Sequence, residues 1–425
     1  MVKDVATTRV SIDTLGCKLN QAESELMVRQ LVEAGCQMVS SASEADIYIL
    51  NTCTVTHTTD SKSRHLLRAA RRQNPDIRQV LIGCFTERAL NELNQVAKID
   101  MILSNADKRM LIQKMQQEGY LGRPGQAVND PKDNQPYFKT RSFIKIQEGC
   151  QNYCTYCIVP FVRGEEENTP TEEIIAAISH KAASGCNEVI LTGTKIGSYR
   201  YNGINLVLLL KRILNDVGAV RLRMSSLQPR ELSSELVELW QDERLCRHFH
   251  LSLQSGNAEI LSRMRREYSI REYQDAIHLI RNQVPEVAIT TDIIVGFPGE
   301  TDEEFQVSYD FCRQIAFSRI HVFPYSPRHG TVAAHMPNKI RDSVKKERTQ
   351  KMLALAQESM ENFNRGFLGK TMSVLWEKQV RDKWSGYTDN YIKVYTENNR
   401  DLTNQLTQVN LGEIRVDGVW GTVLE

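Results

Sequence analysis

The sequence of 425 residues has no apolar run of the roughly 18 residues that a membrane-spanning helix requires. Its first residues, MVKDVATTRV, contain no apolar signal core, and we find no internal repeat and no low-complexity tract. Hydrophobic residues make up 41% of the chain and charged residues 25%, which is typical of a globular protein. These proportions exclude a disordered, collagen-like or membrane-embedded chain. We therefore expect a cytoplasmic protein that does not associate with membranes.

The sequence also lacks an excess of either charge. Lysine and arginine number 53 against 52 acidic residues, so the formal net charge is +1. Such a chain binds nucleic acid only through local basic patches. One candidate lies on a predicted helix over residues 61–72, where basic side chains share a face: Arg64, Arg68, Arg71 and Arg72. This stripe either contacts RNA phosphates or is simply a solvated helix face.

Segments of different pattern follow one another along the chain, which we class as α/β. Residues 1–118 alternate short buried-strand runs with helical patterns and predict a doubly wound α/β domain. Residues 119–136 are rich in Gly, Pro, Asn and Asp, as a linker is. Residues 137–364 contain six βα units, which predict a partial (βα)6 TIM-like barrel because a complete one needs eight. Residues 365–425 are short β-patterned runs broken by glycine, typical of a small β-barrel.

Ten cysteines are unusual for a chain expected in a reducing compartment, where disulfides are rare. Only Cys150, Cys154 and Cys157 form a tight motif, C-x3-C-x2-C. A zinc ribbon would need a second CxxC or a histidine pair, and neither follows nearby. Three thiolates on one loop suit a cubane iron–sulfur cluster with one iron left open. The loop follows the first barrel strand, at the rim where such barrels have their active sites. Inert buried cysteines are the alternative.

A second set of cysteines is separated in sequence but not in the predicted sheet. Cys17, Cys53 and Cys84 each follow a buried strand of the first domain within two or three residues. The ends of parallel strands share one edge of a sheet, the edge at which ligands bind. The three thiolates are therefore predicted to hold a second cluster, unless they are merely small residues at βα turns. The remaining four cysteines should be buried apolar residues: Cys36, Cys186, Cys246 and Cys312.

The C-x3-C-x2-C motif after the first strand of a six-unit barrel resembles that of the radical S-adenosylmethionine (radical SAM) superfamily. The resemblance implies that the open iron binds the amino and carboxylate groups of S-adenosylmethionine. It also implies that an electron passes through the cluster to the sulfonium, giving methionine and a 5′-deoxyadenosyl radical. Tyr156, between the last two cysteines, matches the aromatic residue of the superfamily and is either a cofactor contact or a packing residue.

Short sequence motifs throughout the chain resemble those of the methylthiotransferase family. They are TLGCKLNQ (14–21), NTC (51–53), GC (83–84), TG (192–193), SS (225–226), LQSG (253–256) and TDIIVGFPGE (291–300). The last domain resembles the TRAM module, which delivers RNA substrates in this family. The word around Cys17 is most similar to the MtaB-type branch, whose members add a methylthio group to N6-threonylcarbamoyladenosine beside the tRNA anticodon. The resemblance implies two 4Fe-4S clusters, S-adenosylmethionine, a tRNA substrate and a reductase such as flavodoxin or ferredoxin.

Polar or small residues at the predicted strand ends are candidate contacts for S-adenosylmethionine, although packing or strand capping would also explain them: Thr192, Gly193, Ser225, Ser226 and Gln254. The chain differs from the family after Arg163-Gly164, where Glu165–Glu167 replace basic residues. Methylthiolation of a ribosomal protein side chain, or of isopentenyladenosine in tRNA, are alternative activities. A non-catalytic RNA-binding protein with structural iron–sulfur or zinc sites is the alternative of a different class.

Overall fold

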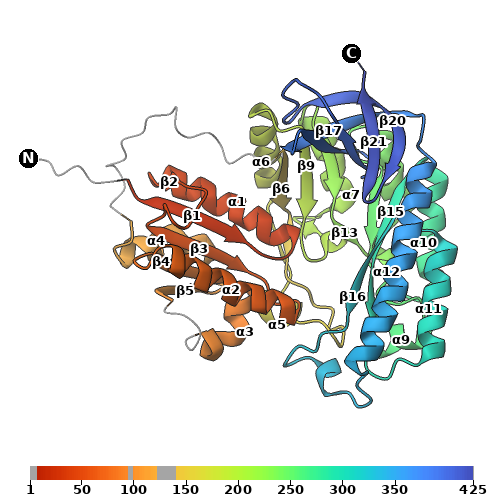
Figure 1. The fold of residues 1–425 in the computed structure, drawn as a ribbon, viewed down its shortest axis with the longest axis horizontal. Helices are drawn as coiled ribbons and strands as arrows, with labels where there is room; N and C mark the ends of the chain where they lie inside the picture. Colours follow the sequence, from red (N-terminus) through yellow and green to blue (C-terminus); the bar gives the residue numbers. More distant parts are fainter. Residues whose placement is uncertain (1–6, 94–98, 122–139, 425) are drawn as a thin grey trace, which may run out of the picture. The chain divides into compact units, whose positions relative to one another are not determined.

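The computed structural model describes residues 7–93, 99–121 and 140–424 (Figure 1). Internal contacts divide the chain into two compact units. The first comprises Met1–Phe138, Gly149–Gln151 and Ile158–Glu166, and the second comprises Lys139–Glu148, Asn152–Cys157 and Glu167–Glu425. Residues 122–136 of the predicted linker lie outside the described residues. No helix in the described part of the chain has the length and apolar character needed to cross a membrane.

The first unit is built on a five-stranded parallel sheet of order β2-β1-β3-β4-β5. Its strands are β1 (Arg9–Thr14), β2 (Gln37–Met38), β3 (Ile47–Thr52), β4 (Arg78–Gly83) and β5 (Met101–Leu103). Its helices are α1 (Lys18–Glu33), α2 (His57–Gln73), α3 (Cys84–Leu93), α4 (Leu111–Gln117) and α5 (Val159–Arg163).

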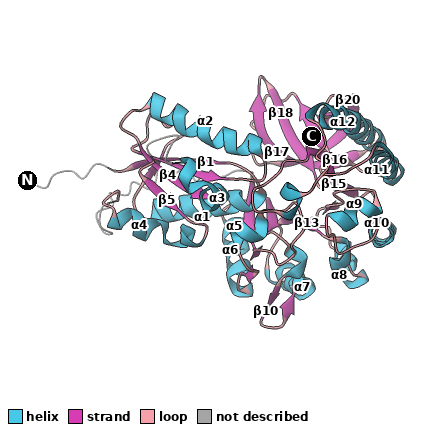
Figure 2. Ribbon diagram, turned by 90° about the horizontal axis from the view of Figure 1, so that it is seen from below, coloured by secondary structure: helices cyan, strands magenta, loops and turns pink. Residues whose placement is uncertain are grey.

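Helices cover both faces of this sheet, because its strands are apolar on both sides (Figure 2). Met27 of α1 and Met115 of α4 pack with Ile49 on one face. Leu67 of α2 packs with Leu50 on the other face. This arrangement confirms the predicted doubly wound α/β sheet.

The second unit contains seven strand segments in two parallel sheets, of orders β12-β9-β6 and β13-β14-β15-β16, and β12 and β13 follow each other as one strand position of the barrel. The strands are β6 (Arg141–Lys145), β9 (Glu188–Thr192), β12 (Arg221–Met224), β13 (Ser226–Leu227), β14 (His248–Leu251), β15 (Ala288–Val295) and β16 (Arg319–Pro324). Only Ser225 separates β12 from β13, so one chain segment passes from the first sheet into the second. The two sheets thereby form the predicted partial barrel of six strands.

The helices between these strands are α6 (Thr171–Ala183), α7 (Leu206–Asp216), α8 (Ser234–Glu238), α9 (Ala258–Arg263), α10 (Ile270–Gln283) and α11 (Asp302–Ile315), and α12 (Asp342–Arg365) follows the last strand. Two short antiparallel pairs join β7 (Gln147–Glu148) with β8 (Glu167–Asn168) across the cysteine loop, and β10 (Arg200–Tyr201) with β11 (Ile204–Asn205) in a hairpin.

Side chains alternate between the two faces of these strands. One set, exemplified by Val189, Phe249 and Ile293, joins the hydrophobic core that the surrounding helices complete. The opposite set contains charged and polar residues on every strand, among them Arg223 and Asp292. The concave face of the partial barrel is therefore polar, as a chamber for a polar ligand would be.

The chain ends in a closed five-stranded barrel of order β17-β18-β19-β21-β20. Its strands are β17 (Thr371–Val380), β18 (Lys383–Thr388), β19 (Lys393–Thr396), β20 (Leu406–Arg415) and β21 (Gly418–Val423). Trp376 and Trp384 fill its core. The structure thus confirms the small β-barrel expected at the end of the chain.

Buried charges fasten this small barrel to the larger one. The Arg223 guanidinium is fully buried, binds both Glu188 carboxylate oxygens at 2.8 and 3.0 Å, and donates to the carbonyls of Thr388 and Asp389. The Tyr391 ring lies 4.4 Å from the Arg223 guanidinium. Tyr391 is thus part of this junction within the second unit.

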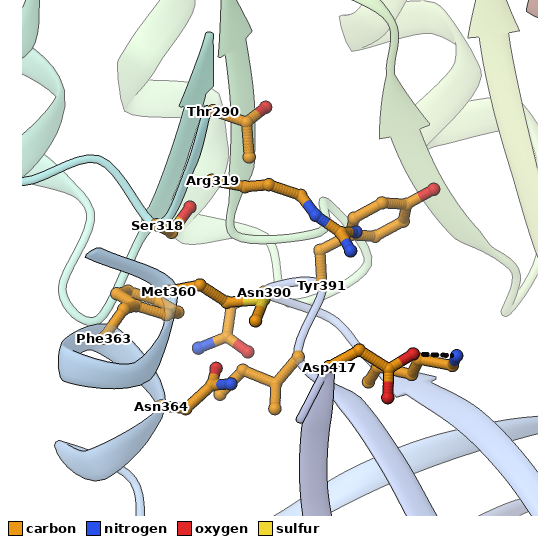
Figure 3. A pocket seen from close by; sticks show the side chains of 11 residues that line it. Thr290, Ser318, Arg319, Met360, Phe363, Asn364, Asn390, Tyr391 and Asp417 are labelled. Atoms are coloured by element: carbon orange, nitrogen blue, oxygen red, sulfur yellow. Dashed lines mark hydrogen bonds and ion pairs between the residues drawn. The ribbon is translucent and has the colours of Figure 1, made fainter. Parts of the chain in front are cut away.

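A small cavity lies at the same junction (Figure 3). It is lined by Thr290 and Arg319 of the partial barrel and by Asn390, Tyr391 and Asp417 of the terminal barrel. Its volume of about 20 Å³ has room for about one water molecule. It is therefore too small to be a substrate site.

Candidate active site

The three dispersed cysteines of the first unit meet at one edge of its sheet. Cys17 follows β1 and is the N-cap residue of α1, Cys53 directly follows β3, and Cys84 directly follows β4 and begins α3. The strands β1, β3 and β4 are neighbours in the sheet. The N-termini of α1 and α3 add partial positive charge beside the sulfurs, which favours thiolates and an anionic cluster.

Electrostatic coupling shows that these sulfurs share one location. Burial raises the pKa of the Cys53 thiol to about 12, and a charge at either Cys17 or Cys84 raises it further. Burial also raises the pKa of Cys84, against the opposite effect of the Arg163 and Lys108 cations. The raised pKa values keep Cys53 and Cys84 protonated until a metal binds and displaces their protons.

Gly16 shows how closely the chain is packed around this edge. Its φ is +97°, and a Cβ atom built there would lie 2.4 Å from the Cys53 Cβ and 2.7 Å from its Sγ. Only glycine combines this backbone conformation with so close an approach. The Gly-Cys pair at positions 16 and 17 therefore positions two of the three thiols at once.

We expect Gly16→Ala to lower the free energy of unfolding by about 2–4 kcal/mol, from backbone strain plus the clash with Cys53. It should also reduce the iron bound at this edge. Gly185→Ala is the matched control, because Gly185 has a φ of +86° and open space around its missing Cβ. Urea unfolding followed by circular dichroism, together with iron analysis, measures both effects. Equal losses in the two variants would contradict the packing role of Gly16.

A buried ionic network stands beside the three thiols. Arg163 of α5 binds Glu23 at 2.9 Å and also donates to Asn20, and Lys108 forms an ion pair with the same Glu23. Asn20 in turn donates to the carbonyls of Leu15 and Thr52, at the ends of two strands. Two cations against one carboxylate leave net positive charge next to the sulfurs, which stabilises an anionic cluster.

The short helix α5 carries the chain from the C-x3-C-x2-C motif to this network. Ile158 and Val162 pack on Cys84, and the Asn105 side chain donates to the Val162 carbonyl at 2.5 Å. Arg163, which the family resemblance singles out, is thus an internal residue of the first unit. The acidic residues after it are partly or fully exposed, with the Glu166 carboxylate accepting from the Gln151 amide.

The C-x3-C-x2-C motif occupies a loop with little regular structure between β7 and α5. Gly149, with a φ of +75°, precedes the motif, and a Cβ atom there would lie 1.8 Å from the Glu165 carbonyl oxygen. The Cys157 amide donates to the Cys154 carbonyl at 3.0 Å, and Thr155 donates to the carbonyls of Met264 and Arg263. Backbone contacts thus hold the cysteine loop in shape.

Arg266 and Tyr268 stand next to this loop within the second unit, a role that sequence reasoning missed. Arg266 Nη1 lies 3.3 Å from the Cys154 sulfur, and Arg266 Nε lies 3.2 Å from the Tyr268 hydroxyl. That hydroxyl donates to the carbonyls of Ser252 and Leu253. Burial raises the pKa of Tyr156, which lies in the field of Arg266 and Cys154.

The predicted cofactor contacts lie at strand ends of the second unit. Thr192 ends β9, Ser225 and Ser226 lie where β12 passes into β13, and Gln254 pairs with Ile293 of β15. Gly193 packs so closely on Gln147 that a Cβ atom would lie 2.6 Å from its carbonyl oxygen. Within the described residues, the buried Ser225 hydroxyl has no hydrogen-bond partner, as expected of a group that awaits a ligand. The assignment of these residues to S-adenosylmethionine remains a prediction.

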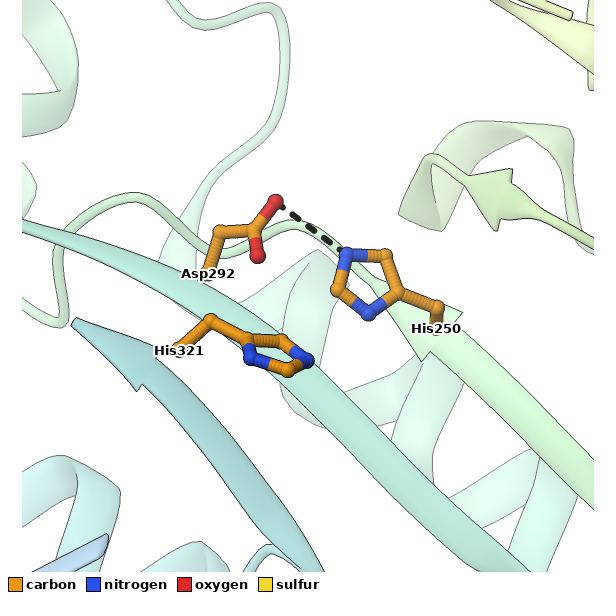
Figure 4. Close-up of side chains that lie close together, drawn as sticks. All are labelled: His250, Asp292 and His321. Carbon is orange, nitrogen blue, oxygen red and sulfur yellow. Dashed lines mark hydrogen bonds and ion pairs between the residues drawn. The ribbon is translucent and has the colours of Figure 1, made fainter. Parts of the chain in front are cut away.

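Sequence reasoning also missed a cluster of His250, Asp292 and His321. The ligand-type atoms of these three residues lie within 4.8 Å of one another (Figure 4). The residues are 42 and 29 positions apart and come together only through the pairing of neighbouring strands. The polar alternation of those strands indicates which face the side chains lie on, but not which residues of neighbouring strands meet.

The structure divides the predicted basic stripe on α2. Arg71 binds the Asp100 carboxylate at 3.0 Å and the carbonyls of Pro75 and Ile77, so its charge is used inside the first unit. Arg64 lies over the Phe85 ring, and Arg68 and Arg72 are exposed. RNA binding stays a prediction for all four residues, and Arg71 in addition holds the first unit together. The four cysteines expected to be inert are buried, as predicted.

Each set of three thiols has the donor chemistry that a cubane iron–sulfur cluster takes, and the assignment of both clusters stays a prediction. Each set offers three sulfur donors on backbone that glycine and hydrogen bonds hold in place. Within the described residues, the cysteines not assigned to either set are each buried in a hydrophobic core or beneath a strand, so they supply no fourth ligand. Three thiolates leave one iron of a cubane free for an exogenous ligand.

Comparisons with known proteins agree with this arrangement. Residues 144–312 match the model of the radical SAM superfamily, and residues 9–104 match that of the uncharacterized protein family UPF0004. The chain is 33% identical to the threonylcarbamoyladenosine tRNA methylthiotransferase MtaB of Bacillus subtilis, over 95% of this chain and 93% of that one. The MtaB protein of Aquifex aeolicus is 35% identical, over 93% of this chain and 98% of its own.

A second group of relatives carries a different substrate in its name. The tRNA-2-methylthio-N(6)-dimethylallyladenosine synthase of Endomicrobium trichonymphae is 33% identical, over 97% of this chain and 99% of its own. Among solved structures, the radical S-adenosylmethionine methyltransferase TsrM of Kitasatospora setae covers 76% of this chain and 77% of its own, with a TM-score of 0.56 and 15% identity. That similarity concerns the fold alone.

Proposed function

Because this chain belongs to the radical SAM methylthiotransferase family, we propose that it adds a methylthio group to C2 of N6-threonylcarbamoyladenosine next to the tRNA anticodon. The product is 2-methylthio-N6-threonylcarbamoyladenosine. The observation that carries the proposal is the convergence of Cys17, Cys53 and Cys84 at one sheet edge. A radical enzyme with only the C-x3-C-x2-C cluster would have no use for three further thiols gathered beside buried cations.

The chain's own residues would divide the work between two sites. When bound, the clusters and S-adenosylmethionine supply a sulfur platform and the radical that attacks the adenine C2–H bond. Cys150, Cys154 and Cys157 would hold one cluster, and Cys17, Cys53 and Cys84 the other. The C2–H is not acidic enough for a side chain to remove as a proton, so the protein positions the base and excludes water from the radical.

The choice of N6-threonylcarbamoyladenosine rests on the MtaB relatives and on the TLGCKLNQ word around Cys17. The structure gives that word a physical basis, since its Gly16 packs on Cys53 and its Asn20 ties two strand ends to Arg163. We further propose that the reaction takes place in the cytoplasm, with flavodoxin or ferredoxin as the electron donor.

Mass spectrometry of tRNA nucleosides from cells with and without the gene tests the proposal. We expect 2-methylthio-N6-threonylcarbamoyladenosine to disappear on deletion while N6-threonylcarbamoyladenosine accumulates. A plasmid copy should restore the product, and a copy carrying Cys157→Ala should not. An unchanged tRNA profile in a strain without a second such gene would contradict the proposal.

The dimethylallyl relatives make dimethylallyladenosine the second candidate substrate, because their identity and coverage equal those of the MtaB relatives. The same nucleoside profile separates the two, since deletion would then remove the 2-methylthio form of dimethylallyladenosine. A ribosomal protein side chain is the remaining alternative, and intact-mass analysis of ribosomal proteins would detect it.

A further inference from the structure

Three side chains converge on the concave face of the partial barrel. His250 lies on β14, Asp292 on β15 and His321 on β16, which are neighbouring strands, and the strand register places Asp292 directly beside His321 (Figure 4). His250 Nε2 lies 3.2 Å from the Asp292 carboxylate. The ring centroids of the two histidines are 5.9 Å apart. We call these three residues the His-Asp-His cluster.

A path of contacts connects the cluster with the C-x3-C-x2-C loop inside the second unit. The Ser252 hydroxyl lies 3.4 Å from the Asp292 carboxylate. The backbone carbonyl of Ser252 accepts a hydrogen bond from the Tyr268 hydroxyl. Tyr268 contacts Arg266, and Arg266 contacts the sulfur of Cys154. The cluster therefore faces the same interior as this cysteine. Its residues lie on the strand face opposite to the side chains that pack against the helices.

The charges of the cluster are set for binding a polar group. Burial alone would favour a neutral Asp292, yet His250, His321 and the Ser252 hydroxyl lower its pKa, so the side chain is a carboxylate. His250 is held at its other nitrogen by the Thr290 hydroxyl at 2.9 Å. His321 is exposed on the concave face. The interior thus presents an ionised acceptor flanked by imidazoles that donate or accept.

The two substrate classes named among the relatives differ only in the group on N6 of adenosine. A threonylcarbamoyl group has N–H and O–H donors, a carbonyl and a carboxylate, whereas a dimethylallyl group is a hydrocarbon. An apolar group placed against Asp292 and two histidines would strip them of water without replacing their hydrogen bonds. Sites built to bind a polar group reject an analogue that lacks it far more strongly than apolar pockets reject an extra methylene.

We propose that His250, Asp292 and His321 form the subsite that binds the threonylcarbamoyl group and excludes the dimethylallyl group. This inference rests on the proposed function and goes beyond it, because it assigns the substrate choice to three residues. Asp292 accepts from the donors of the polar group, and the imidazole of His321 faces its oxygen atoms. His250 positions the Asp292 carboxylate through the bond between them.

The test measures the binding of synthetic anticodon stem-loops to the enzyme loaded with its iron–sulfur clusters, under anaerobic conditions. The RNAs carry threonylcarbamoyladenosine, dimethylallyladenosine or plain adenosine at the target position, and fluorescence anisotropy measures their Kd. We expect the unmodified enzyme to bind the threonylcarbamoyl RNA at least about tenfold more tightly than the other two. His321→Phe and Asp292→Asn should remove this preference and leave the Kd of the adenosine RNA unchanged.

His278→Phe is the matched control, because His278 is exposed on the outer helix α10 of the same barrel. It should keep the full preference. Since His321 is exposed, its variant tests the idea even if Asp292→Asn unfolds. Persistence of the preference in the folded His321→Phe and Asp292→Asn proteins would overturn the subsite.

Two further results have distinct meanings. If the unmodified enzyme methylthiolates only the dimethylallyl RNA, the proposed function itself fails. If it methylthiolates the threonylcarbamoyl RNA while His321→Phe and Asp292→Asn keep the binding preference for that RNA, only the subsite fails. Electron paramagnetic resonance would detect binding of one Mn²⁺ per chain to the enzyme loaded with its iron–sulfur clusters. Such binding, if lost in both variants, would make the His-Asp-His cluster a metal site and overturn the proposal.

Discussion

Replacing Cys53 by alanine is expected to abolish methylthiolation while cleavage of S-adenosylmethionine to 5′-deoxyadenosine continues. The substitution removes one of three thiols at the edge of the first sheet, whereas the C-x3-C-x2-C loop keeps all of its cysteines. Iron content should fall from about eight to about four atoms per chain, since each cubane holds four. Iron analysis, product mass spectrometry and quantification of 5′-deoxyadenosine measure the three effects on one preparation.

Cys36→Ala provides the matched control for this experiment. Cys36 lies in the first unit and is as deeply buried as Cys53, each being 4% exposed, but it packs in the opposite hydrophobic core. Its variant should keep about eight irons and full activity. Methylthiolation that survives unchanged in Cys53→Ala would show that the second cysteine set does not carry the sulfur. Zinc in place of iron in the native protein would contradict the radical mechanism.

Removal of the buried Arg223 side chain should produce the largest change in stability. In Arg223→Ala the Glu188 carboxylate stays buried without its partner, and two carbonyls of the terminal barrel lose their donor. Breaking a buried pair in this way costs about 3–5 kcal/mol. All four tryptophans of the sequence belong to the second unit, so tryptophan fluorescence during urea unfolding follows that unit alone.

Two further variants make this result interpretable. Arg212→Ala breaks the exposed pair between Arg212 and Glu172, and we expect a much smaller loss of stability, because exposed ion pairs contribute little. The double variant Arg223→Met with Glu188→Leu removes both charges together and should recover most of the lost stability, because apolar residues of similar volume replace buried pairs well. Equal stability of Arg223→Ala and Arg212→Ala would show that Arg223 does not fasten the two barrels.

Helices with strong local signals were predictable from the sequence to the residue. The sequence predicts helices over residues 270–283 and 302–315, and α10 and α11 have these bounds. Ser269 with Glu272, and Thr301 with Glu304, form reciprocal caps at their starts. Two strands were predicted where the structure has the single strand β20. Gly412 had been interpreted as a break, but it lies at a bulge between Leu411 and Glu413 that the pairing with β21 accommodates. The elements that were missed include the strands β18 and β21 and the helices α4, α5 and α9.

The two kinds of site differed in how far they could be predicted. The cysteines could be placed together because each follows a parallel strand, and the ends of such strands meet irrespective of register. The His-Asp-His cluster lies within strands instead, so its assembly depends on which residue of β15 faces which residue of β16. Register is set by tertiary packing and is not visible in a single sequence. The contact between Arg266 and Cys154 was likewise not predictable, because it depends on a turn of the chain that follows α9.

The interleaving of the two units limits how this protein can be divided into pieces. Residues 158–166 belong with the first unit although they follow the C-x3-C-x2-C loop in sequence. A fragment that ends in the region 119–136 would lack Arg163, which binds Glu23, and would uncover Cys84 where Ile158 and Val162 pack. The first sheet is therefore not a detachable module: a fragment that stops before residue 149 lacks part of the first unit's interior, and transplantation between relatives must carry both segments together.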